Sequence, residues 1–445
     1  MFSALFILVL LALGLSASAG STDKAPMPPP SDDVFYQVPE NLSLLSPGTI
    51  LRHRPVEHAP STAMNSDLNV LATHQIMYRT TDSHGNATAT VMTVLVPFKA
   101  NYSRVVSYQV AQNTAAVDCA PSYAFQLGSL PAGVLGSILT KSELLLISTA
   151  LAKHWVVLVP DYLGPKAAFG ANKLAGQAVL DGMRAAVRST TVTQIDKGAL
   201  LTMWGYSGGA LASGWAAELH PRYAPELRIV GAAMGGLAPN VSAVVKDLGR
   251  TPHGGIVVAG LVGLANEFPA IDDILTSPRM NPAYERYFEE ARTGCLLSNA
   301  VQLGRIDFKK MLNDSDIRTL PAVLDVMDQV SLGKAVPKIP LMMYHASLDL
   351  MTPRNFVNVL YATYCLQGGV VVLRKEILAS HVTAAVTGTP AVLNFLEDVM
   401  SGGKVETCWE GTMISSLLER AVLKKLPGIL SKAFRAAVGK RIGAV

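Results

Sequence analysis

The chain has 445 residues, of which 50% are hydrophobic and 16% are charged, and its formal net charge is +4. This balance excludes a disordered chain, and the length is enough for one large α/β domain with an insertion or for two domains. The charge is uneven, because residues 411–445 hold seven basic groups and one acidic group, or +6, which leaves −2 on the remainder. A body without a broad basic surface does not indicate nucleic acid as a partner.

The N-terminus begins with an apolar run over residues 4–13. Small residues follow it, and Ala17 and Ala19 fit the −3 and −1 positions of a cleavage site after Ala19. This pattern predicts a signal peptide over residues 1–19 and therefore export, although no Lys or Arg precedes the apolar run. A buried N-terminal helix is the alternative. No later run has the length of a membrane-spanning helix.

Cysteines and sequons agree with export. The cysteines are even in number and lack the Cys-x-x-Cys spacing of zinc or redox motifs, so we expect two disulfides; they are Cys119, Cys295, Cys365 and Cys408. Asn-x-Ser/Thr sequons are candidate glycosylation sites on a secreted chain. They begin at Asn41, Asn86, Asn101, Asn240 and Asn313.

Apolar strands alternate with helical segments through the first half of the chain. Residues 73–80 and 87–97 form a predicted β-hairpin around turn-forming residues. Further strands are predicted at 104–110, 155–160, 199–204 and 228–234, and helices at 142–153, 173–188 and 209–219. This order predicts an α/β fold with a parallel sheet that helices cover on both faces.

The pattern changes after the predicted strand at 228–234. Residues 235–338 contain helical pieces and turns without a buried strand, whereas strands resume at 339–344 and 369–373. A helical insertion in an α/β chain is therefore predicted, placed as a cap over the site. The predicted division is a signal peptide (1–19), a first core part (20–234), the cap (235–338), a second core part (339–410) and a basic amphipathic segment (411–445), which is read as surface helices or as a lipid-facing element.

One Gly-x-Ser-x-Gly sequence stands between a predicted strand and a predicted helix. It is Gly205-Tyr206-Ser207-Gly208-Gly209. A nucleophilic serine needs this context, because it sits on a strained turn where glycines leave room for neighbouring backbone. A glycine-rich turn without chemistry is the alternative. With both flanks present, Ser207 is the candidate nucleophile.

A serine nucleophile needs a base and an orienting carboxylate, which follow it in the order Ser, Asp or Glu, His in such folds. Asp349 lies in the loop after the strand at 339–344, and His381 is the one histidine that remains after it. Asp325 and Asp328 lie in helical sequence and are weaker candidates. His345 is a rival base, but it precedes Asp349 and breaks the order. The predicted triad is therefore Ser207, Asp349 and His381.

Several motifs together resemble the fungal secretory lipases over roughly residues 40–410. They are Gly205-Tyr206-Ser207-Gly208-Gly209-Ala210, Ser107-Tyr108-Gln109-Val110 with Asp118-Cys119-Ala120-Pro121-Ser122-Tyr123, Tyr223-Ala224-Pro225-Glu226-Leu227 with Val230-Gly231-Ala232, and His345-Ala346 before Asp349. The resemblance implies an α/β-hydrolase core with a helical cap and the same triad. It also implies that Cys119 pairs with Cys295 and Cys365 with Cys408.

The resemblance also implies an oxyanion hole. Its members would be the backbone amide of Gly208, which the elbow geometry requires as well, and Asn113. The family usually has Asp at the position of Asn113. An Asn side chain can still donate a hydrogen bond, so we expect a hole of altered strength or pH dependence.

These features predict a secreted serine hydrolase that cleaves carboxylic esters through an acyl-enzyme, without a metal or an organic cofactor. Lipases for long-chain triacylglycerols and esterases that deacetylate secondary metabolites such as trichothecenes both fit the resemblance. The expected partners are an ester substrate and a lipid-water interface, with no stable protein partner. A binding protein that keeps the fold without catalysis is the alternative of another class, and the intact triad argues against it.

Overall fold

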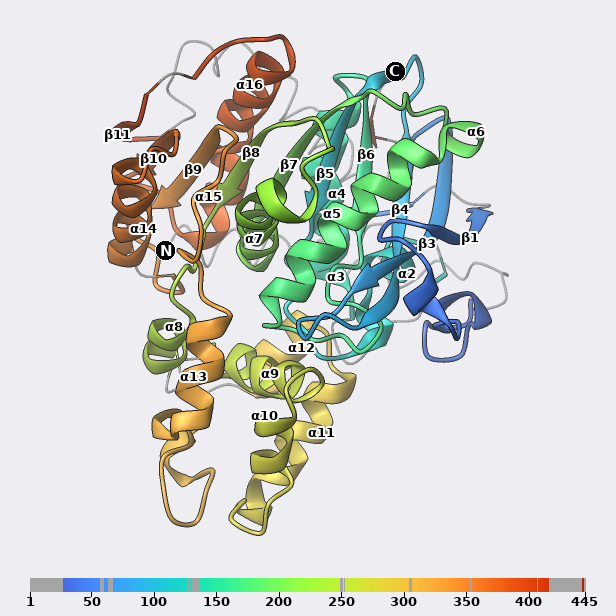
Figure 1. Cartoon of the computed structure of the whole chain (residues 1–445). Helices are drawn as coiled ribbons and strands as arrows, with labels where there is room; N and C mark the ends of the chain where they lie inside the picture. The colour runs from blue at the N-terminus through green and yellow to red at the C-terminus, as the bar shows by residue number, and fades with distance from the viewer. Residues whose placement is uncertain are drawn as a thin grey trace.

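A computed structural model describes residues 27–56, 60–62, 67–126, 128–129, 136–248, 251, 253–303, 306–352, 354–405, 407–415 and 442–443. The predicted signal peptide and most of the predicted C-terminal basic segment lie outside these residues. Figure 1 shows two parts, a body built on a central sheet and a group of helices at the lower end of the view.

The central sheet of the described chain has ten strands in the order β1-β3-β4-β6-β5-β7-β8-β9-β10-β11. The strands on the β1 side pair antiparallel as far as β6, and all pairs from β6 to β11 are parallel. The bounds are β1 (Ile50–Pro55), β3 (Ala72–Thr81), β4 (Ala87–Val96), β5 (Asn101–Gln109), β6 (Trp155–Pro160), β7 (Leu200–Tyr206), β8 (Ile229–Gly235), β9 (Leu341–Ala346), β10 (Val371–Glu376) and β11 (Trp409–Met413). The predicted hairpin is β3 and β4, and the predicted parallel strands are all present.

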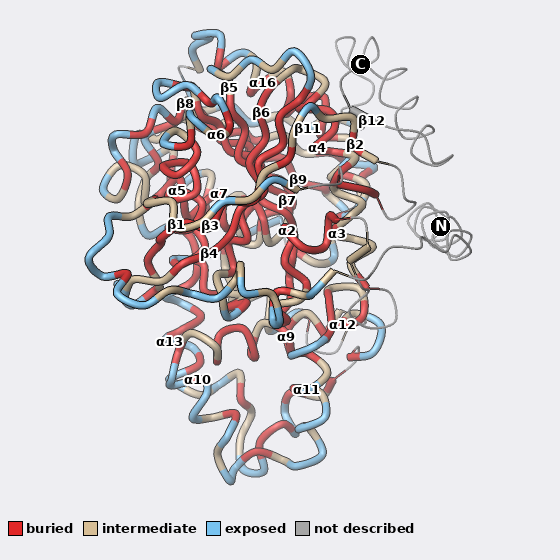
Figure 2. The backbone as a smooth tube through the Cα atoms, turned by 90° about the vertical axis from the view of Figure 1, so that its right-hand side faces the viewer, coloured by how far each residue is buried: buried red, intermediate tan, exposed pale blue. Residues whose placement is uncertain are grey.

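Helices cover both faces of this sheet, as the alternation of strands and helices predicts. The two faces have separate apolar cores, and the strands between them are buried in Figure 2. One core contains α5 (Asn172–Arg188), α7 (Gly208–Tyr223) and α14 (Arg354–Leu366), and the other contains α4 (Leu144–Leu151), α15 (His381–Thr387) and α16 (Thr389–Met400). Shorter helices are α2 (Pro121–Ala124), α3 (Ile138–Ser142) and α6 (Thr190–Thr193).

The segment between β8 and β9 forms the lower group of helices in Figure 1. Its apolar side chains make a third core, to which α9 contributes buried Val258, Leu261 and Val262. The helices are α8 (Val241–Leu248), α9 (Gly254–Ala265), α10 (Pro269–Leu275), α11 (Glu285–Thr293), α12 (Leu296–Gln302) and α13 (Pro321–Gln329). We call this segment the cap.

A buried glutamate holds the chain where it returns from the cap to the sheet. The carboxylate of Glu218, on α7, accepts hydrogen bonds from the backbone amides of Gly333, Lys334 and Ala335 at 2.7–3.1 Å. The hydroxyl of Tyr364 on α14 also donates to it. Because three backbone amides donate to one carboxylate, the segment that returns from the cap to the sheet is fixed against α7.

Two features at the end of the chain differ from the predicted division. β11 crosses the predicted boundary at residue 410 and continues the sheet to Met413. The short strand β12 (Ile442–Gly443) pairs parallel with β2 (Leu68–Asn69), so these two residues are not helical. Each of these strands is paired in parallel with a neighbouring strand.

No single helix among the described residues is long and apolar enough to cross a membrane. The bent pair α9 and α10, with 119° between its members, passes the same test by length and composition only.

Candidate active site

Ser207 occupies a strained turn between β7 and α7. Its φ is 53° and its ψ is −119°, a conformation that L residues rarely adopt and that recurs at functional sites. The turn is so tight that a Cβ on Gly205 would stand 2.2 Å from the carbonyl oxygen of Gly209. The glycines of the motif therefore allow the close approach of backbone that the predicted elbow needs.

The three residues of the predicted triad lie together. The Nε2 atom of His381 is 2.9 Å from the Oγ atom of Ser207, and its Nδ1 atom is 2.7 Å from Oδ2 of Asp349. They come from loops after three parallel strands, β7, β9 and β10, which end at the same edge of the sheet. A residue far along the chain can therefore meet Ser207.

A capping box at the start of α15 sets the position of His381. The Ser380 side chain accepts from the backbone amide of Thr383, and the Thr383 side chain accepts from the backbone amide of Ser380. His381 is the first residue of the helix that this box begins. The local sequence Ser-x-x-Thr therefore fixes the direction of the imidazole.

Asp349 receives more donors than the imidazole alone. The amides of Met351 and Thr352 donate to its Oδ1 atom at 2.9 Å each, and the Thr352 hydroxyl donates to Oδ2 at 2.7 Å. Burial raises the pKa of Asp349, but the hydrogen bond and charge of His381, with help from Thr352, outweigh it and hold the pKa at about 2. The carboxylate is thus ionised at neutral pH. Sequence reasoning missed Thr352, since a threonine in a loop carries no signal of its own.

The alternative residues of the sequence analysis have other positions. His345 is buried and its Nε2 atom is 3.9 Å from Oδ2 of Asp349, while it makes no contact with Ser207 that would make it a base. Burial lowers its pKa, which favours the neutral ring. Asp325 and Asp328 lie on α13 in the cap, where they bind Gln329 and Lys334.

Asn113 and Gly208, the predicted oxyanion residues, lie against each other beside Ser207. All three line one cavity, and a Cβ on Gly208 would stand 1.9 Å from Oδ1 of Asn113. Asn113 has a φ of 42°, in the left-handed region that Asn tolerates better than most residues. Gly208 is the first residue of α7, so its amide belongs to the helix N-terminus, which favours negative charge.

The loop that carries Asn113 is anchored on both sides. The carboxylate of Glu143 accepts hydrogen bonds from the amide of Ala111 at 2.9 Å and from the hydroxyl of Tyr108 at 2.7 Å. On the other side, the Thr114 hydroxyl donates to the carbonyl of Gly294 in the cap at 2.8 Å. These anchors hold the backbone that the positive φ would otherwise destabilise.

Two disulfides join distant segments, with the pairing that the family resemblance implies. Cys119 is bonded to Cys295 and Cys365 to Cys408, and no described cysteine is free. The first links the segment after Asn113 to the cap. The second links α14 to the residue before β11 at the edge of the sheet.

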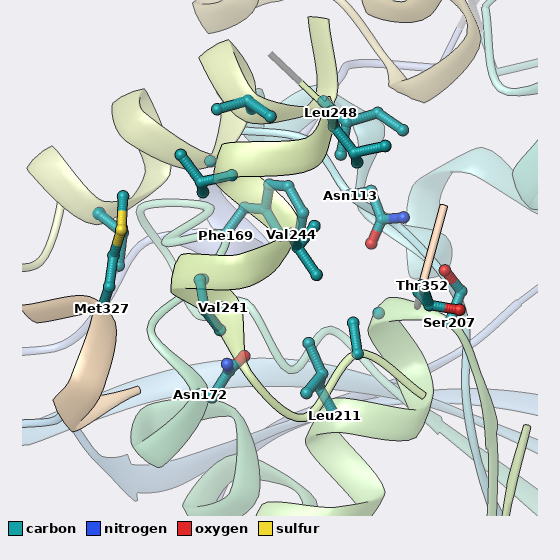
Figure 3. A pocket seen from close by; sticks show the side chains of 18 of the residues that line it. Asn113, Phe169, Asn172, Ser207, Leu211, Val241, Val244, Leu248, Met327 and Thr352 are labelled. Atoms are coloured by element: carbon teal, nitrogen blue, oxygen red, sulfur yellow. The ribbon is translucent and has the colours of Figure 1, made fainter. Parts of the chain in front are cut away.

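The cavity beside Ser207 extends beneath the cap. In Figure 3, Ser207, Thr352 and Asn113 lie at one end and Met327 lies at the other, with Val241 and Val244 of α8 between them. Of the twenty described residues that line it, four have polar side chains: Asn113, Asn172, Ser207 and Thr352. Such a cavity is suited to an apolar ligand beside Ser207.

The five candidate glycosylation sites are all within the described chain. Four of them are exposed, at Asn41, Asn86, Asn101 and Asn313, whereas Asn240 is half-buried. The side chain of Asn240 accepts a hydrogen bond from the amide of Ala243 at 2.9 Å.

Comparison with known proteins gives one family. The model of the secretory lipase family matches residues 130–407. The chain is 39% identical to Lipase A of Arthroderma benhamiae, over 93% of this chain and 89% of that protein. It is 35% identical to Lipase 5 of Candida albicans, over 92% of this chain and 88% of that protein.

Solved structures agree with the sequence comparison. The crystal structure of Candida antarctica lipase A superimposes with a TM-score of 0.79 at 27% identity, over 94% of this chain and 99% of that one. This likeness and the mixed sheet with helices on both faces confirm the α/β-hydrolase fold that the sequence predicts.

Proposed function

The chain belongs to the secretory lipase family and is a carboxylic-ester hydrolase, and we propose that Ser207, His381 and Asp349 carry its reaction. The observation that supports this proposal most is the line of hydrogen bonds from Asp349 through His381 to Ser207. Ser207, at the end of that line, is one of the residues that line an apolar cavity. An ester whose acyl chain lies in the cavity would present its carbonyl carbon to Ser207.

The reaction has two halves. In the first, Ser207 Oγ attacks the carbonyl carbon while His381 Nε2 takes its proton, and the developing oxyanion accepts hydrogen bonds from the Gly208 amide and Asn113. The tetrahedral intermediate then expels the alcohol, to which His381 returns the proton. In the second half, water attacks the acyl-serine, His381 takes the water's proton and passes it to Ser207, and the carboxylic acid leaves. Asp349 stays ionised throughout and stabilises the charged imidazole.

The cavity supports a lipase that takes fatty acyl chains. It continues from Ser207 past Leu211, one turn further along α7, to Met327 of the cap, with apolar side chains for most of its length. An acetyl group would leave this apolar surface without a partner. Deacetylation of a secondary metabolite is the competing proposal, and it places the cavity around the alcohol part of the substrate instead.

Exposed apolar side chains beside the triad support action at a lipid-water interface. Leu348 and Leu350 flank Asp349 and are 60% and 85% exposed, and Leu378, three residues before His381, is 69% exposed. Met351 continues this surface into the cavity. Large apolar side chains that stay exposed around a site opening favour contact with an apolar phase.

Secretion forms part of the proposal. Family membership supports an extracellular protein, and the predicted signal peptide at residues 1–19 supplies the route. Glycans on the four exposed sequons would then point into solvent.

A fluorophosphonate probe tests the catalytic roles. The wild-type protein should be labelled at one serine, and Ser207→Ala should abolish both labelling and ester hydrolysis. His381→Ala should slow labelling strongly, while Ser46→Ala, an exposed serine outside every sequon, should behave as wild type. Labelling that persists in Ser207→Ala would contradict the proposed nucleophile.

A series of p-nitrophenyl esters from acetate to palmitate separates the lipase from the deacetylase. A lipase should show kcat/KM rising with chain length and a further gain when the ester is emulsified. Preference for acetate, without any gain at the interface, would reject the lipase in favour of the deacetylase.

A further inference from the structure

We call the cavity beside Ser207 the acyl cavity. Among its described lining residues, one polar side chain lies in the part that is distant from Ser207. Three of the four polar side chains lie at the Ser207 end, but Asn172, the first residue of α5, lies away from them. Figure 3 shows Asn172 near Met327 and separated from Ser207 by Leu211. A polar group in an otherwise apolar surface needs an explanation, because burial of an unpaired amide is unfavourable.

A hydrogen bond fixes the orientation of this side chain. The Nδ2 atom of Asn172 donates to the carbonyl of Val330 at 2.8 Å, so the amide nitrogen faces the end of α13. The Oδ1 atom must then point the other way, and in Figure 3 the oxygen is turned toward the cavity. The residue is 6% exposed, and no donor among the described residues reaches Oδ1.

The carbonyl of Val330 has a second hydrogen-bond donor besides Asn172. The Nε1 atom of Trp215 donates to the same carbonyl at 3.1 Å. Asn172 is therefore not needed to satisfy that carbonyl, and a leucine there would leave it paired. What asparagine adds at this position is an acceptor that faces the cavity.

We propose that the acyl cavity selects fatty acyl chains that carry a hydroxyl group, which donates a hydrogen bond to Oδ1 of Asn172. This inference rests on the proposed function and names the substrate class within it. Away from the Ser207 end, a hydroxyl on an acyl chain would be buried unpaired along the apolar walls, whereas at Asn172 it meets an acceptor of fixed direction. A site with a fixed polar group favours the substrate that pairs with it over the analogue that lacks the partner.

The rise of helix α7 allows an estimate of how far Asn172 lies from an ester bond at Ser207. Trp215 is eight residues after Ser207, or about two turns and roughly 11–12 Å along the axis. Gly176, one turn after Asn172 on α5, packs against the backbone of Trp215, and Leu211 separates Asn172 from Ser207 in Figure 3, so Asn172 lies beyond Leu211 and no further along than Trp215. The hydroxyl therefore belongs in the middle or outer part of a medium or long chain, and not beside the ester carbonyl.

The test compares p-nitrophenyl dodecanoate with its monohydroxy isomers, with the hydroxyl moved from the middle of the chain to its end. Rates are expressed per active site titrated with a fluorophosphonate, so partial misfolding of a variant does not enter. In the wild-type protein, one position should raise kcat/KM relative to the plain ester by roughly two- to tenfold, the range of one net hydrogen bond. In Asn172→Leu, which has a similar volume, the order should reverse in favour of the plain ester.

Val241→Leu is the matched control, because it changes the wall of the same cavity on the side where Asn172 lies and keeps the acceptor. It should alter the rates for plain and hydroxylated chains together and leave their ratio near the wild-type value. Hydroxylated chains that are all slower than the plain ester in the wild type would overturn the proposal and assign Oδ1 to a bound water. A preference that survives Asn172→Leu would overturn it as well. Failure to hydrolyse even the plain ester would instead contradict the proposed function on which it rests.

Discussion

The carboxylate of Glu143 accepts a hydrogen bond from the backbone amide of Ala111 at 2.9 Å, two residues before Asn113. Tyr108 holds the same carboxylate from the end of β5 at 2.7 Å. Burial raises the pKa of Glu143 to about 8, although both hydrogen bonds lower it. We infer that this buried side chain holds the loop of residues 110–114, which carries Asn113 and which we call the oxyanion loop.

Substitution of Glu143 should therefore lower kcat more than it changes KM. Glu143→Ala leaves the Ala111 amide without its acceptor, and we expect kcat to fall about tenfold, below the loss of 10²-fold or more that follows removal of an oxyanion donor itself. Glu143→Gln keeps an acceptor of the same shape and should stay within about twofold of wild type. Equal losses in both variants, or a loss confined to KM, would show that Glu143 does not act through the loop.

Asp161 predicts a pH dependence of stability. It is buried at the end of β6, accepts hydrogen bonds from the amide and hydroxyl of Ser122, and burial raises its pKa to about 7. The folded state therefore binds a proton more tightly than the unfolded state, whose carboxyl has a pKa near ~4. The tighter proton binding at Asp161 adds to the free energy of unfolding. This addition is fully present below about pH 4 and is lost as the pH rises through about 7.

The direction of this pH dependence can be checked by measuring the melting temperatures of the wild type and Asp161→Asn between pH 4 and 8. The advantage of the wild type should be greatest at the acidic end and should shrink as the pH rises. The exposed Asp272→Asn is the control and should not follow this course. An advantage that grows with pH would mean that Asp161 is stabilised as the carboxylate.

Long apolar strands and the glycine motif made the central sheet and Ser207 predictable from the sequence. The six residues of β6 are all buried, and an apolar run of this length fits a buried strand because it is too short for a buried helix. The edge strands β1 and β11 were missed. Their sequences are polar and partly exposed, and their strand conformation depends on pairing with β3 and β10, which the local sequence does not encode.

The placement of the residues of the proposed site was predictable where chain order constrained it, and was not predictable where only contacts define it. Asp349 and His381 follow successive strands in the order that the fold requires, and that was enough to select them. Thr352, Glu143 and Asn172 are connected to the proposed site by one or two hydrogen bonds each, to residues far along the chain or across a loop. Nothing in their neighbouring sequence distinguishes them from other polar residues.

The two disulfides should differ in their contribution to stability. Cys119 and Cys295 are 176 residues apart, whereas Cys365 and Cys408 are 43 apart. In the chain-entropy model this corresponds to roughly 5 and 4 kcal/mol respectively, so the longer loop gains about 1 kcal/mol more. The double variant Cys119→Ala/Cys295→Ala should therefore unfold at lower urea than Cys365→Ala/Cys408→Ala.

The same pair of variants should differ in activity. The first disulfide and the bond from Thr114 to Gly294 both tie the oxyanion loop to the cap, while the second disulfide lies at the edge of the sheet. At a temperature where both variants are folded, we expect kcat to fall in the first and to stay near wild type in the second. Equal activities would show that the hydrogen bond alone holds the loop.

Asn113 stands where the family resemblance implies an Asp, and the contacts of its side chain give this difference a measurable consequence. The Oδ1 atom of Asn113 is buried against Gly208 without a hydrogen-bond partner among the described residues. An amide in this place stays neutral at every pH. A carboxyl would ionise as the pH rises, and its negative charge would repel the oxyanion that forms beside Gly208.

Asn113→Asp should therefore lose kcat as the pH increases, with a limb that the wild-type profile lacks. Asn113→Gly is the control, because glycine accepts the φ of 42° and keeps the backbone amide. It should lower kcat by a factor that does not change with pH, since only the side chain is removed. Parallel pH profiles for Asn113→Asp and wild type would mean that the carboxyl stays protonated or points away from the oxyanion. In that case the family's Asp and this chain's Asn would be equivalent, and the backbone amide alone would carry the contribution of residue 113.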